Sequence, residues 1–354
     1  MRFGLSWRPE IGSGILRHLD EIDAVEIMAE DFVDADRASR RALRFLGEQV
    51  PVVVHATTLG LASTEPAARK RLDAIARVIE WLRPEFWSEH LAFVRAGGSE
   101  IGHLAAPPRN DEMLEGLTHN VEVARGVIGS APLLENIASL VDPPFSTYDE
   151  AEWLTAVTRT TGSKLLLDLH NLHANATNFG FDAHSVIARL PHERIGAIHL
   201  AGGKRIEGDR ILDDHLHAVP DEVYTLLGEL DADATVIIER DGQYPEFGVL
   251  LDELRRARAV EKTRGQRDSA TWGAALRGHE SSSPQVLPFL AKLYTDPTTR
   301  AQFLGSPFET ARCAGFSAQD ARTLASIDLE AVTLAARSYE KKRTRRSASG
   351  SLHT

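Results

Sequence analysis

Cysteine is almost absent from this sequence of 354 residues, and its absence excludes two classes of protein. The single cysteine, Cys313, cannot form an intramolecular disulfide and cannot build a zinc cluster from thiolates. The composition therefore predicts a protein of a reducing compartment, and we expect a cytoplasmic location. We expect Cys313 itself to be a small residue of the core.

Long apolar runs and an excess of basic residues are also missing. No stretch approaches the roughly 20 apolar residues of a membrane span, and the N-terminal sequence MRFGLSWRPEIGSG lacks the plan of a signal peptide. The chain has 51 acidic and 40 basic side chains and a formal net charge of -11, which argues against a surface that holds nucleic acid. We therefore expect neither a membrane nor a nucleic acid as partner, whereas a peptide or a cation stays possible.

Short apolar runs alternate with longer amphipathic segments along the chain. Helical periodicity is clear at 65–82 and 147–162, and the second segment has Thr147 and Glu150 at the spacing of a capping box. Strands separated by helices imply right-handed crossovers and a parallel sheet. Eight such runs predict an α/β protein with a closed (β/α)8 TIM barrel, and no dinucleotide fingerprint follows the first run. The runs are residues 2–7, 24–30, 52–58, 85–93, 131–137, 164–170, 195–202 and 235–241.

Side chains that can bind metal ions occur in six of these runs. The carboxyl ends of barrel strands converge on one mouth, so we expect these side chains to meet there. A lone histidine in an apolar strand is more often a hydrogen-bonded core residue. Burial of so many titratable groups without partners would cost several kcal/mol each, so a cation among them is expected. The residues are His55, His90, Glu135, Asp168, His170, His199 and Glu239.

Two elements of the pattern D-x-H stand out. Asp168 and His170 end the run LLLDLHN, and on an extended backbone they would point to the same side. Asp213 and His215 form the second element in the segment DDHLH, which by itself is equally typical of a solvated acidic turn. Its position directly after a barrel strand favours a shared ion site. Nitrogen and oxygen ligands without sulfur suit iron, manganese or zinc, and carboxylates able to bridge, such as Glu135, favour more than one ion.

Nine segments in one order carry a family resemblance. Residues 2 to about 260 resemble the multinuclear non-heme iron-dependent oxidative enzymes, which include the methanobactin-synthesis oxidase and other maturases of ribosomally made peptides. The segments are GLSWRPE (4–10), VEIMAEDF (25–32), VVVHATTLGLAS (52–63), SEHLAF (88–93), LLENIAS (133–139), LLLDLHNLHANATNFGFD (165–182), IHLAGG (198–203), LDDHLHAVPDEVY (212–224) and IIERDG (237–242).

The resemblance implies a chemistry and a substrate class. It implies a TIM barrel with two or three iron ions in mixed ferrous and ferric states, and dioxygen as co-substrate. The substrate would be a ribosomally synthesised precursor peptide that is oxidised at a cysteine or at a C-terminal residue. A separate protein that recognises this peptide is a possible further partner.

The resemblance also implies a set of ligands. Family members often have asparagine at the position of His170 and usually keep Asn171, so either residue could complete a coordination shell. We take Asp168, His170, Asn171 and Asp213 as candidate catalytic residues. The eight implied ligands are His55, His90, Glu135, Asp168, His199, Asp213, His215 and Glu239.

Other polar residues near strand ends could contact the substrate. Arg8, Glu30 and Arg240 are candidates, although ion pairs that support the ligands are the other interpretation. Asp31 and Phe32 replace the family's usual Asn-Tyr, so the entrance to the pocket is expected to differ from that of its relatives.

The last ninety residues differ in character from the first 260. We expect the barrel to span 1–260, a polar linker 261–283, a helical extension 284–340 and a disordered basic tail 341–354. The extension is predicted to bind the precursor peptide or its leader and to take no part in the chemistry. A helical appendage that merely packs on the barrel is the alternative.

Three other functions are compatible with such a barrel. A sugar isomerase or epimerase with one divalent ion would need fewer ligands than the sequence offers. A zinc phosphodiesterase would need a basic surface facing DNA, which the net charge of -11 opposes. A non-catalytic alternative is a metal-dependent scaffold that presents a peptide to another enzyme.

Overall fold

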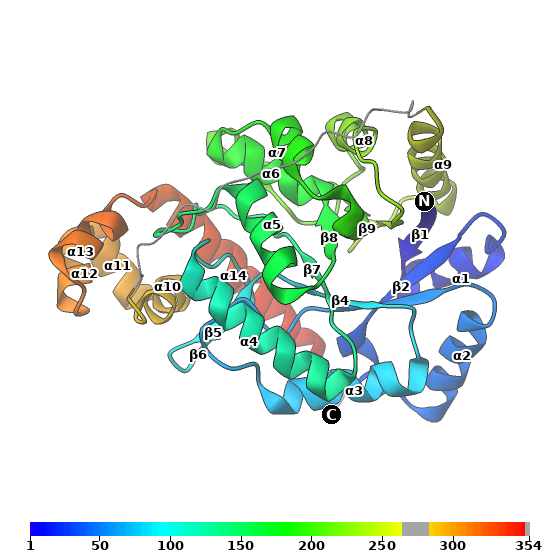
Figure 1. The fold of residues 1–354 in the computed structure, drawn as a ribbon, viewed down its shortest axis with the longest axis horizontal. Coiled ribbons are helices and arrows are strands. Elements are labelled where there is room, and N and C mark those ends of the chain that lie inside the picture. Colours follow the sequence, from blue (N-terminus) through cyan, green and yellow to red (C-terminus); the bar gives the residue numbers. More distant parts are fainter. Residues whose placement is uncertain (264–282, 351–354) are drawn as a thin grey trace.

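Eight parallel strands close into a barrel in this computed structural model, which describes residues 1–263 and 283–350 (Figure 1). Each strand pairs with parallel neighbours in the order β1-β12-β9-β8-β7-β4-β3-β2, which confirms the predicted TIM barrel. The barrel strands are β1 (Arg2–Ser6), β2 (Ala24–Met28), β3 (Val52–Ala56), β4 (Trp87–His90), β7 (Leu133–Glu135), β8 (Leu165–Asp168), β9 (Ile195–Leu200) and β12 (Thr235–Ile238).

Helices cover the outside of the barrel, and their ends follow ordinary capping chemistry. The predicted helix at 147–162 is observed as α5, but its capping box joins Asp149 to Glu152 and not Thr147 to Glu150. It ends at Gly162, whose φ of 71° a glycine adopts without strain. The helices of the barrel are α1 (Pro9–Arg17), α2 (Arg37–Gly47), α3 (Arg69–Leu82), α4 (Asp111–Ile128), α5 (Glu150–Thr161), α6 (Leu169–Phe179), α7 (Ala183–Arg189), α8 (Asp221–Leu227) and α9 (Phe247–Thr263).

Two of the predicted apolar runs end earlier than expected. The run 85–93 divides after His90, where β4 gives way to an antiparallel hairpin of β5 (Phe93–Ala96) and β6 (Ser99–Ala105). The run 164–170 ends at Asp168, because helix α6 begins at Leu169. A second, short hairpin of β10 (Lys204–Arg205) and β11 (Ile211–Leu212) follows β9.

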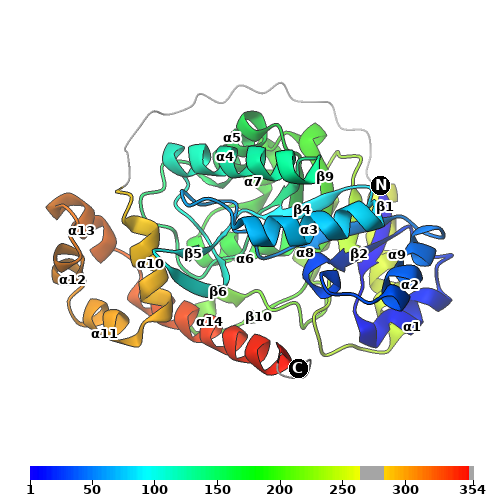
Figure 2. The same cartoon turned by 90° about the horizontal axis from the view of Figure 1, so that it is seen from below.

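A helical extension follows the barrel, as predicted, and packs on the β5–β6 hairpin. Figure 2 shows α10 and α14 beside the hairpin, while α11 to α13 lie farther from the barrel. The core of the extension contains ring contacts of Phe289 with Phe303 and Phe316. Its helices are α10 (Val286–Thr295), α11 (Pro297–Gly305), α12 (Pro307–Cys313), α13 (Ala318–Ala325) and α14 (Leu329–Gly350).

Glycines of the hairpin make room for the extension. A Cβ atom at Gly97 would lie 2.8 Å from Cβ of Pro288 in α10, and one at Gly102 would lie 2.3 Å from Cγ of Arg343 in α14. Both glycines also have positive φ, at 57° and 72°. The hairpin and the extension are therefore fitted to each other at two points.

Some predicted boundaries and environments need correction. The predicted disordered tail is wrong for residues 341–350, which continue helix α14; residues 351–354 lie outside the described residues. The predicted linker begins too early, because α9 continues to Thr263, and residues 264–282 also lie outside the described part. Cys313 is exposed at the end of α12 and is not a core residue.

Within residues 1–263 and 283–350, no helix is both long enough and apolar enough to cross a bilayer.

Candidate metal centre

Three neighbouring strands bring a first group of ligand atoms together at the barrel mouth. His55 is the last residue but one of β3, His90 ends β4 and Glu135 ends β7, and all three side chains are buried. Nε2 of His55 lies 3.3 Å from Nε2 of His90. Oε2 of Glu135 lies 3.2 Å from the first of these nitrogens and 3.3 Å from the second. The three atoms form a nearly equilateral triangle.

The size of this triangle suits one metal ion. Nitrogen and oxygen ligands lie about 2.0–2.2 Å from a zinc-sized divalent ion, which places adjacent ligand atoms roughly 3.0–3.4 Å apart at tetrahedral or octahedral angles. The separations among His55, His90 and Glu135 fall in that interval. Three side chains are thus arranged as a metal would require.

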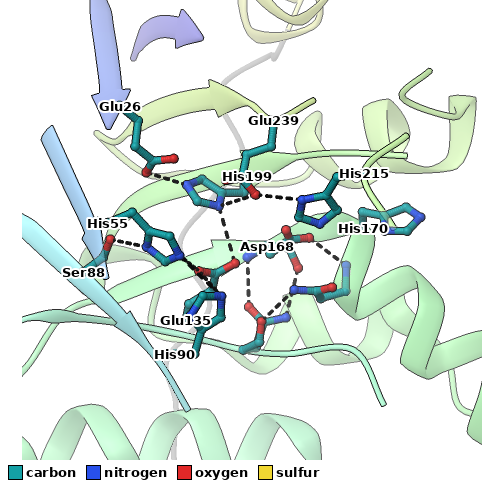
Figure 3. Close-up of polar contacts among 12 residues, drawn as sticks. Glu26, His55, Ser88, His90, Glu135, Asp168, His170, His199, His215 and Glu239 are labelled. Atoms are coloured by element: carbon teal, nitrogen blue, oxygen red, sulfur yellow. Dashed lines mark hydrogen bonds and ion pairs between the residues drawn. The ribbon is translucent and has the colours of Figure 1, made fainter. Parts of the chain in front are cut away.

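A second group adjoins the first and shares Glu135. Nδ1 of His199 lies 3.4 Å from Oε1 of Glu135 and 3.3 Å from Oε2 of Glu239. Asp168 lies beside His199 in the strand register and offers a further oxygen, so that four ligand atoms lie within 4.8 Å of one another. Glu135 therefore turns one carboxylate oxygen toward each group (Figure 3), as a carboxylate that bridges two ions does.

The loop after β9 extends this cluster. Nδ1 of His215 lies 3.1 Å from Oε2 of Glu239, and its Nε2 lies 2.8 Å from Oδ1 of Asp213. His215 has a φ of 53°, a left-handed conformation that is uncommon for a residue with a Cβ. Such strain is typical of residues whose position serves a site. The second D-x-H element thus contacts Glu239 of the barrel cluster.

The first D-x-H element has a different geometry from the one predicted. Because α6 begins at Leu169, Asp168 and His170 do not share an extended backbone, and the expectation that they point to one side is wrong. Nδ1 of His170 lies 2.9 Å from Oδ1 of Asp213. Asn171 lines the cavity beside the cluster. Its backbone N–H donates to Oδ1 of Asp168, and this carboxylate caps the N-terminus of α6. His170 therefore contacts a candidate ligand, while Asn171 faces the cavity.

Three supporting residues were missed by the sequence analysis. Nε2 of His199 lies 2.9 Å from Oε2 of the buried Glu26, and Nδ1 of His55 lies 2.7 Å from Oγ of Ser88. The side chain of Asn136 pairs with both the backbone N–H and the backbone C=O of Asp168. Contacts of this kind fix the tautomer and orientation of metal ligands. The one available signal was Glu26, a carboxylate in the middle of the apolar strand AVEIM.

Without a metal ion, protonated imidazoles and ionised carboxylates balance each other's charge in the cluster. Burial opposes ionisation of Glu239 and Asp213, yet the neighbouring imidazoles hold the pKa of each carboxyl well below its usual range. Burial likewise opposes protonation of His199 and His215, and the carboxylates still raise the pKa of each imidazole well above its usual range. Protons on these rings therefore occupy the electrostatic role that a metal ion would fill.

Other members of the cluster are shifted by burial or by single neighbours. Burial lowers the pKa of His55 to about 3, so this imidazole is neutral and has a lone pair to offer. Burial acts against protonation of His90, but Glu135 and Glu89 raise its pKa to about 9. Burial, with Glu135 beside it, raises the pKa of Asp168 to about 7. These shifts mark the mouth as a candidate functional site.

Two buried oxygen atoms support occupation by a cation. Oδ2 of Asp168 and Oδ1 of Asn171 have no hydrogen-bond partner among the residues that the structure describes. Unpaired buried acceptors cost free energy unless an ion or water meets them. The donor set, its spacing and these atoms together fit a hard or borderline cation with nitrogen and oxygen ligands.

The cluster opens into a cavity of about 310 Å³ at the barrel mouth. Arg8 lines it, and its Nε donates to Oδ1 of Asp241 at 3.1 Å. Glu30 accepts from the backbone N–H of Thr57, and Arg240 pairs with a buried carboxylate of α9. Arg8 and Arg240 thus form ion pairs, whereas Glu30 accepts hydrogen bonds and forms no ion pair among the contacts described for it. The lining also includes Met28, Thr57, His103, Leu104, Ile137, Ala138, Asp214 and Lys342.

Fold and site together define a class of protein: a TIM-barrel enzyme with a candidate metal cluster at the carboxyl ends of its strands. Residues 2–262 match the model of a family described as RiPP precursor modification enzyme MbnB/TglH/ChrH. The chain therefore belongs to this family of enzymes that modify ribosomally synthesised peptide precursors.

Similar proteins agree with that membership. A UPF0276 protein of Streptomyces avermitilis is 37% identical over 275 residues, which cover 75% of this chain and 56% of the relative. The chain thus spans little more than half the length of that protein. A UPF0276 protein of Rhizorhabdus wittichii is 34% identical over 244 residues, which cover 67% of this chain and 86% of the relative.

Solved structures support the fold alone. The crystal structure of a D-tagatose 3-epimerase-like protein matches with a TM-score of 0.51 at 17% identity, and the match covers 75% of this chain and all of that one. A xylose isomerase-like TIM barrel/4-hydroxyphenylpyruvate dioxygenase fusion protein matches with the same TM-score at 14% identity, over 75% of this chain and 43% of the other.

Proposed function

We propose that this protein is an iron- and dioxygen-dependent oxidase that modifies a ribosomally synthesised precursor peptide. The observation that carries the proposal is the pair of adjoining ligand groups that share Glu135, each of a size for one ion. Membership of a family of peptide-precursor modification enzymes supports the substrate class. Histidine and carboxylate ligands without sulfur suit iron in a site of this kind.

We assign the ligands as follows. His55, His90 and Glu135 would hold one ion. Glu135 would also serve a second ion with Asp168, His199 and Glu239, and Asp213 with His215 would complete that site or hold a third ion. Asn171 is the better candidate than His170 for the remaining position, because its unpaired Oδ1 belongs to a residue that lines the cavity.

Bound iron would supply the electrons for reduction of dioxygen and would favour ionisation of a substrate atom such as a thiol. The chain itself orients and protects this centre. Glu26 and Ser88 fix the rings of His199 and His55, and Asn136 fixes the backbone of Asp168. The burial of the ligand side chains keeps bulk water away from all sides except the mouth. His170 holds Asp213 in place by its contact at 2.9 Å.

The alternative functions use the same fold with fewer ions. A sugar isomerase or epimerase with one divalent ion would leave one of the two groups around Glu135 without a purpose. A zinc phosphodiesterase faces the net charge of -11, and a metal-dependent scaffold would not need an open cavity beside its ligands. The oxidase uses both groups and the cavity.

Reconstitution and turnover test the proposal together. Protein loaded anaerobically with iron should consume dioxygen when a cysteine-containing precursor peptide is added, and the peptide should change in mass. Protein loaded with zinc is the matched control and should leave the peptide unchanged. Epimerisation of a ketose by the manganese-loaded protein, without any peptide product from the iron-loaded protein, would support the epimerase instead.

A further inference from the structure

Helix α14 reaches from the extension to the mouth of the metal cavity. Its residue Lys342 lines the same 310 Å³ cavity as His90, Glu135 and Asn171. Lys342 belongs to the segment 341–354 that the sequence predicts to be a disordered tail, and nothing in the barrel sequence points to it. A side chain more than a hundred residues beyond the last candidate ligand is therefore part of the cavity wall.

The position of Lys342 is fixed by contacts with the β5–β6 hairpin. Its Nζ donates a hydrogen bond of 2.9 Å to Nε2 of His103 in β6. The ring of His103 also meets the ring of Tyr339 edge to face, with centroids 5.0 Å apart. Tyr339 and Lys342 are three residues apart and so lie on one face of α14. The helix therefore holds His103 at two points.

Neighbouring contacts hold the helix itself. Arg343 donates from its guanidinium to the backbone C=O of Ile101 at 2.7 Å, in the space that Gly102 leaves. At the other end of α14, the guanidinium of Arg210 lies 3.5 Å from the carboxylate of Glu330. The ammonium of Lys342 is thus carried by a helix anchored to β6 and to the loop after β9.

The chemistry of the cavity wall then indicates a ligand. The floor consists of carboxylates and imidazoles that are arranged as metal ligands, whereas Lys342 and Arg8 bring positive charge to the wall. A lysine ammonium has three donors on a flexible stem, and it binds an oxyanion as a point charge. A hydrogen bond between ions is roughly twice as strong as one between neutral groups.

We propose that Lys342, held in position by His103, binds a carboxylate of the peptide substrate at the cavity mouth. The peptide nature of the ligand rests on the proposed function, but the carboxylate site does not. The carboxylate would come from the C-terminus of the peptide or from an acidic side chain. Either source would hold the peptide so that its neighbouring atoms face Glu135 and Asn171. Helix α14 then determines substrate specificity in addition to covering the barrel.

Three small probes test the site in the metal-loaded protein. N-acetylglycine carries a C-terminal carboxylate, the α-amide of N-acetylaspartic acid carries a side-chain carboxylate, and N-acetylglycinamide carries neither. Their binding is measured by ligand-observed NMR titration. Lys342→Met keeps the apolar stem and should weaken binding of at least one carboxylate probe about tenfold, the loss expected for one charge-assisted hydrogen bond. Lys342→Arg should restore most of the affinity.

The matched control is Lys341→Met, one residue earlier on the exposed side of α14, which should bind all probes as the unchanged protein does. The neutral probe should be insensitive to all three substitutions. Equal binding of both carboxylate probes by the Lys342→Met and unchanged proteins would overturn the site. The probe that responds identifies the source of the carboxylate.

A second measurement uses the unchanged protein and does not depend on whether a variant folds. In the unchanged protein, a saturating carboxylate probe should slow acetylation of Lys342 by a water-soluble acylating reagent and should leave Lys341 unaffected. Equal acetylation rates of Lys342 with and without probe would overturn the site. The proposed oxidation is tested separately by iron content and peptide mass, so that a carboxylate site in a protein without oxidase activity would refute only the proposed function.

Discussion

The barrel mouth buries titratable side chains, whereas the helical extension buries apolar ones. At the mouth, carboxylates and imidazoles are buried, and their charges balance only with protons or metal ions. In the extension, aromatic rings such as Phe289 and Phe303 are buried against one another. The stability of the extension therefore lies in its own packing, whereas that of the mouth depends on which cations occupy it.

The largest expected effect concerns the residue shared by the two ligand groups. Glu135→Ala should lower the bound metal by more than one equivalent, because both groups lose a ligand. His90→Ala removes a ligand from the first group only and should lower it by about one equivalent. Elemental analysis of both purified variants checks this. Equal losses of one equivalent would show that Glu135 does not bridge.

A supporting residue should have a smaller effect on the same cluster. Glu26→Gln keeps an acceptor near Nε2 of His199 but removes the charge, so metal affinity should fall by roughly 10–100-fold. Competition with a chelator measures the affinity. The control is Glu85→Gln, at an exposed residue that pairs with Arg2, and it should leave the affinity unchanged. An unchanged affinity in Glu26→Gln would mean that the carboxylate does not orient His199.

Substitutions at His170 and Asn171 distinguish a metal ligand from a residue that only supports a ligand. Asn171→Ala removes a cavity-facing oxygen and should change the absorption spectrum of the iron-loaded protein. His170→Ala should weaken the hold on Asp213 and lower metal affinity by up to about tenfold, without a new spectrum. A spectral change confined to His170→Ala would reverse the assignment.

The fit between hairpin and extension is tested by two adjacent glycines. Gly97 and Gly98 both have positive φ, at 57° and 74°, but only Gly97 contacts Pro288. Gly98→Ala should cost about 1 kcal/mol through backbone strain, and Gly97→Ala should cost about 1–3 kcal/mol more through overpacking. Chemical denaturation of the two variants measures the difference. Equal stabilities would show that α10 is not seated on the hairpin.

The smallest effect is the pH dependence of the metal-free protein. The pKa of His90 is raised to about 9 and that of Asp168 to about 7, so the folded state binds more protons than the unfolded chain. The contribution of His90 is present below about pH 6.5 and is lost as the pH rises through about 9. The Tm of chelator-treated protein should therefore fall between pH 6.5 and 9.5, and bound metal should reduce that fall. A flat profile would mean that protons do not replace the ions.

The positions of polar residues near strand ends made the barrel mouth and its cluster of candidate ligands predictable. His55, His90 and Glu135 each lie within an apolar run, and the convergence of the carboxyl ends of the strands then places them together. The break at Asp168 was missed because LLLDLHN reads as one strand, whereas the carboxylate of Asp168 caps a helix there. Local sequence does not distinguish a strand's last residue from a helix's cap when one residue is both.

Contacts between distant segments account for the remaining omissions. Glu26 and Ser88 support ligands on other strands, so their roles depend on the register of the closed barrel. Lys342 lies in a basic stretch that is typical of a solvated tail, and only the docking of α14 on β6 brings it to the mouth. The helical pattern around Cys313 predicts a buried side chain at this position, whereas Cys313 is exposed.

Metal content most directly tests the central claim that Glu135 joins two ion sites. The protein is purified anaerobically, and its metals are quantified per chain by elemental analysis. We expect two or three equivalents of iron, with magnetic coupling between the ions visible in the Mössbauer spectrum. A single equivalent of zinc or manganese, unchanged after reconstitution with excess ferrous iron, would contradict it.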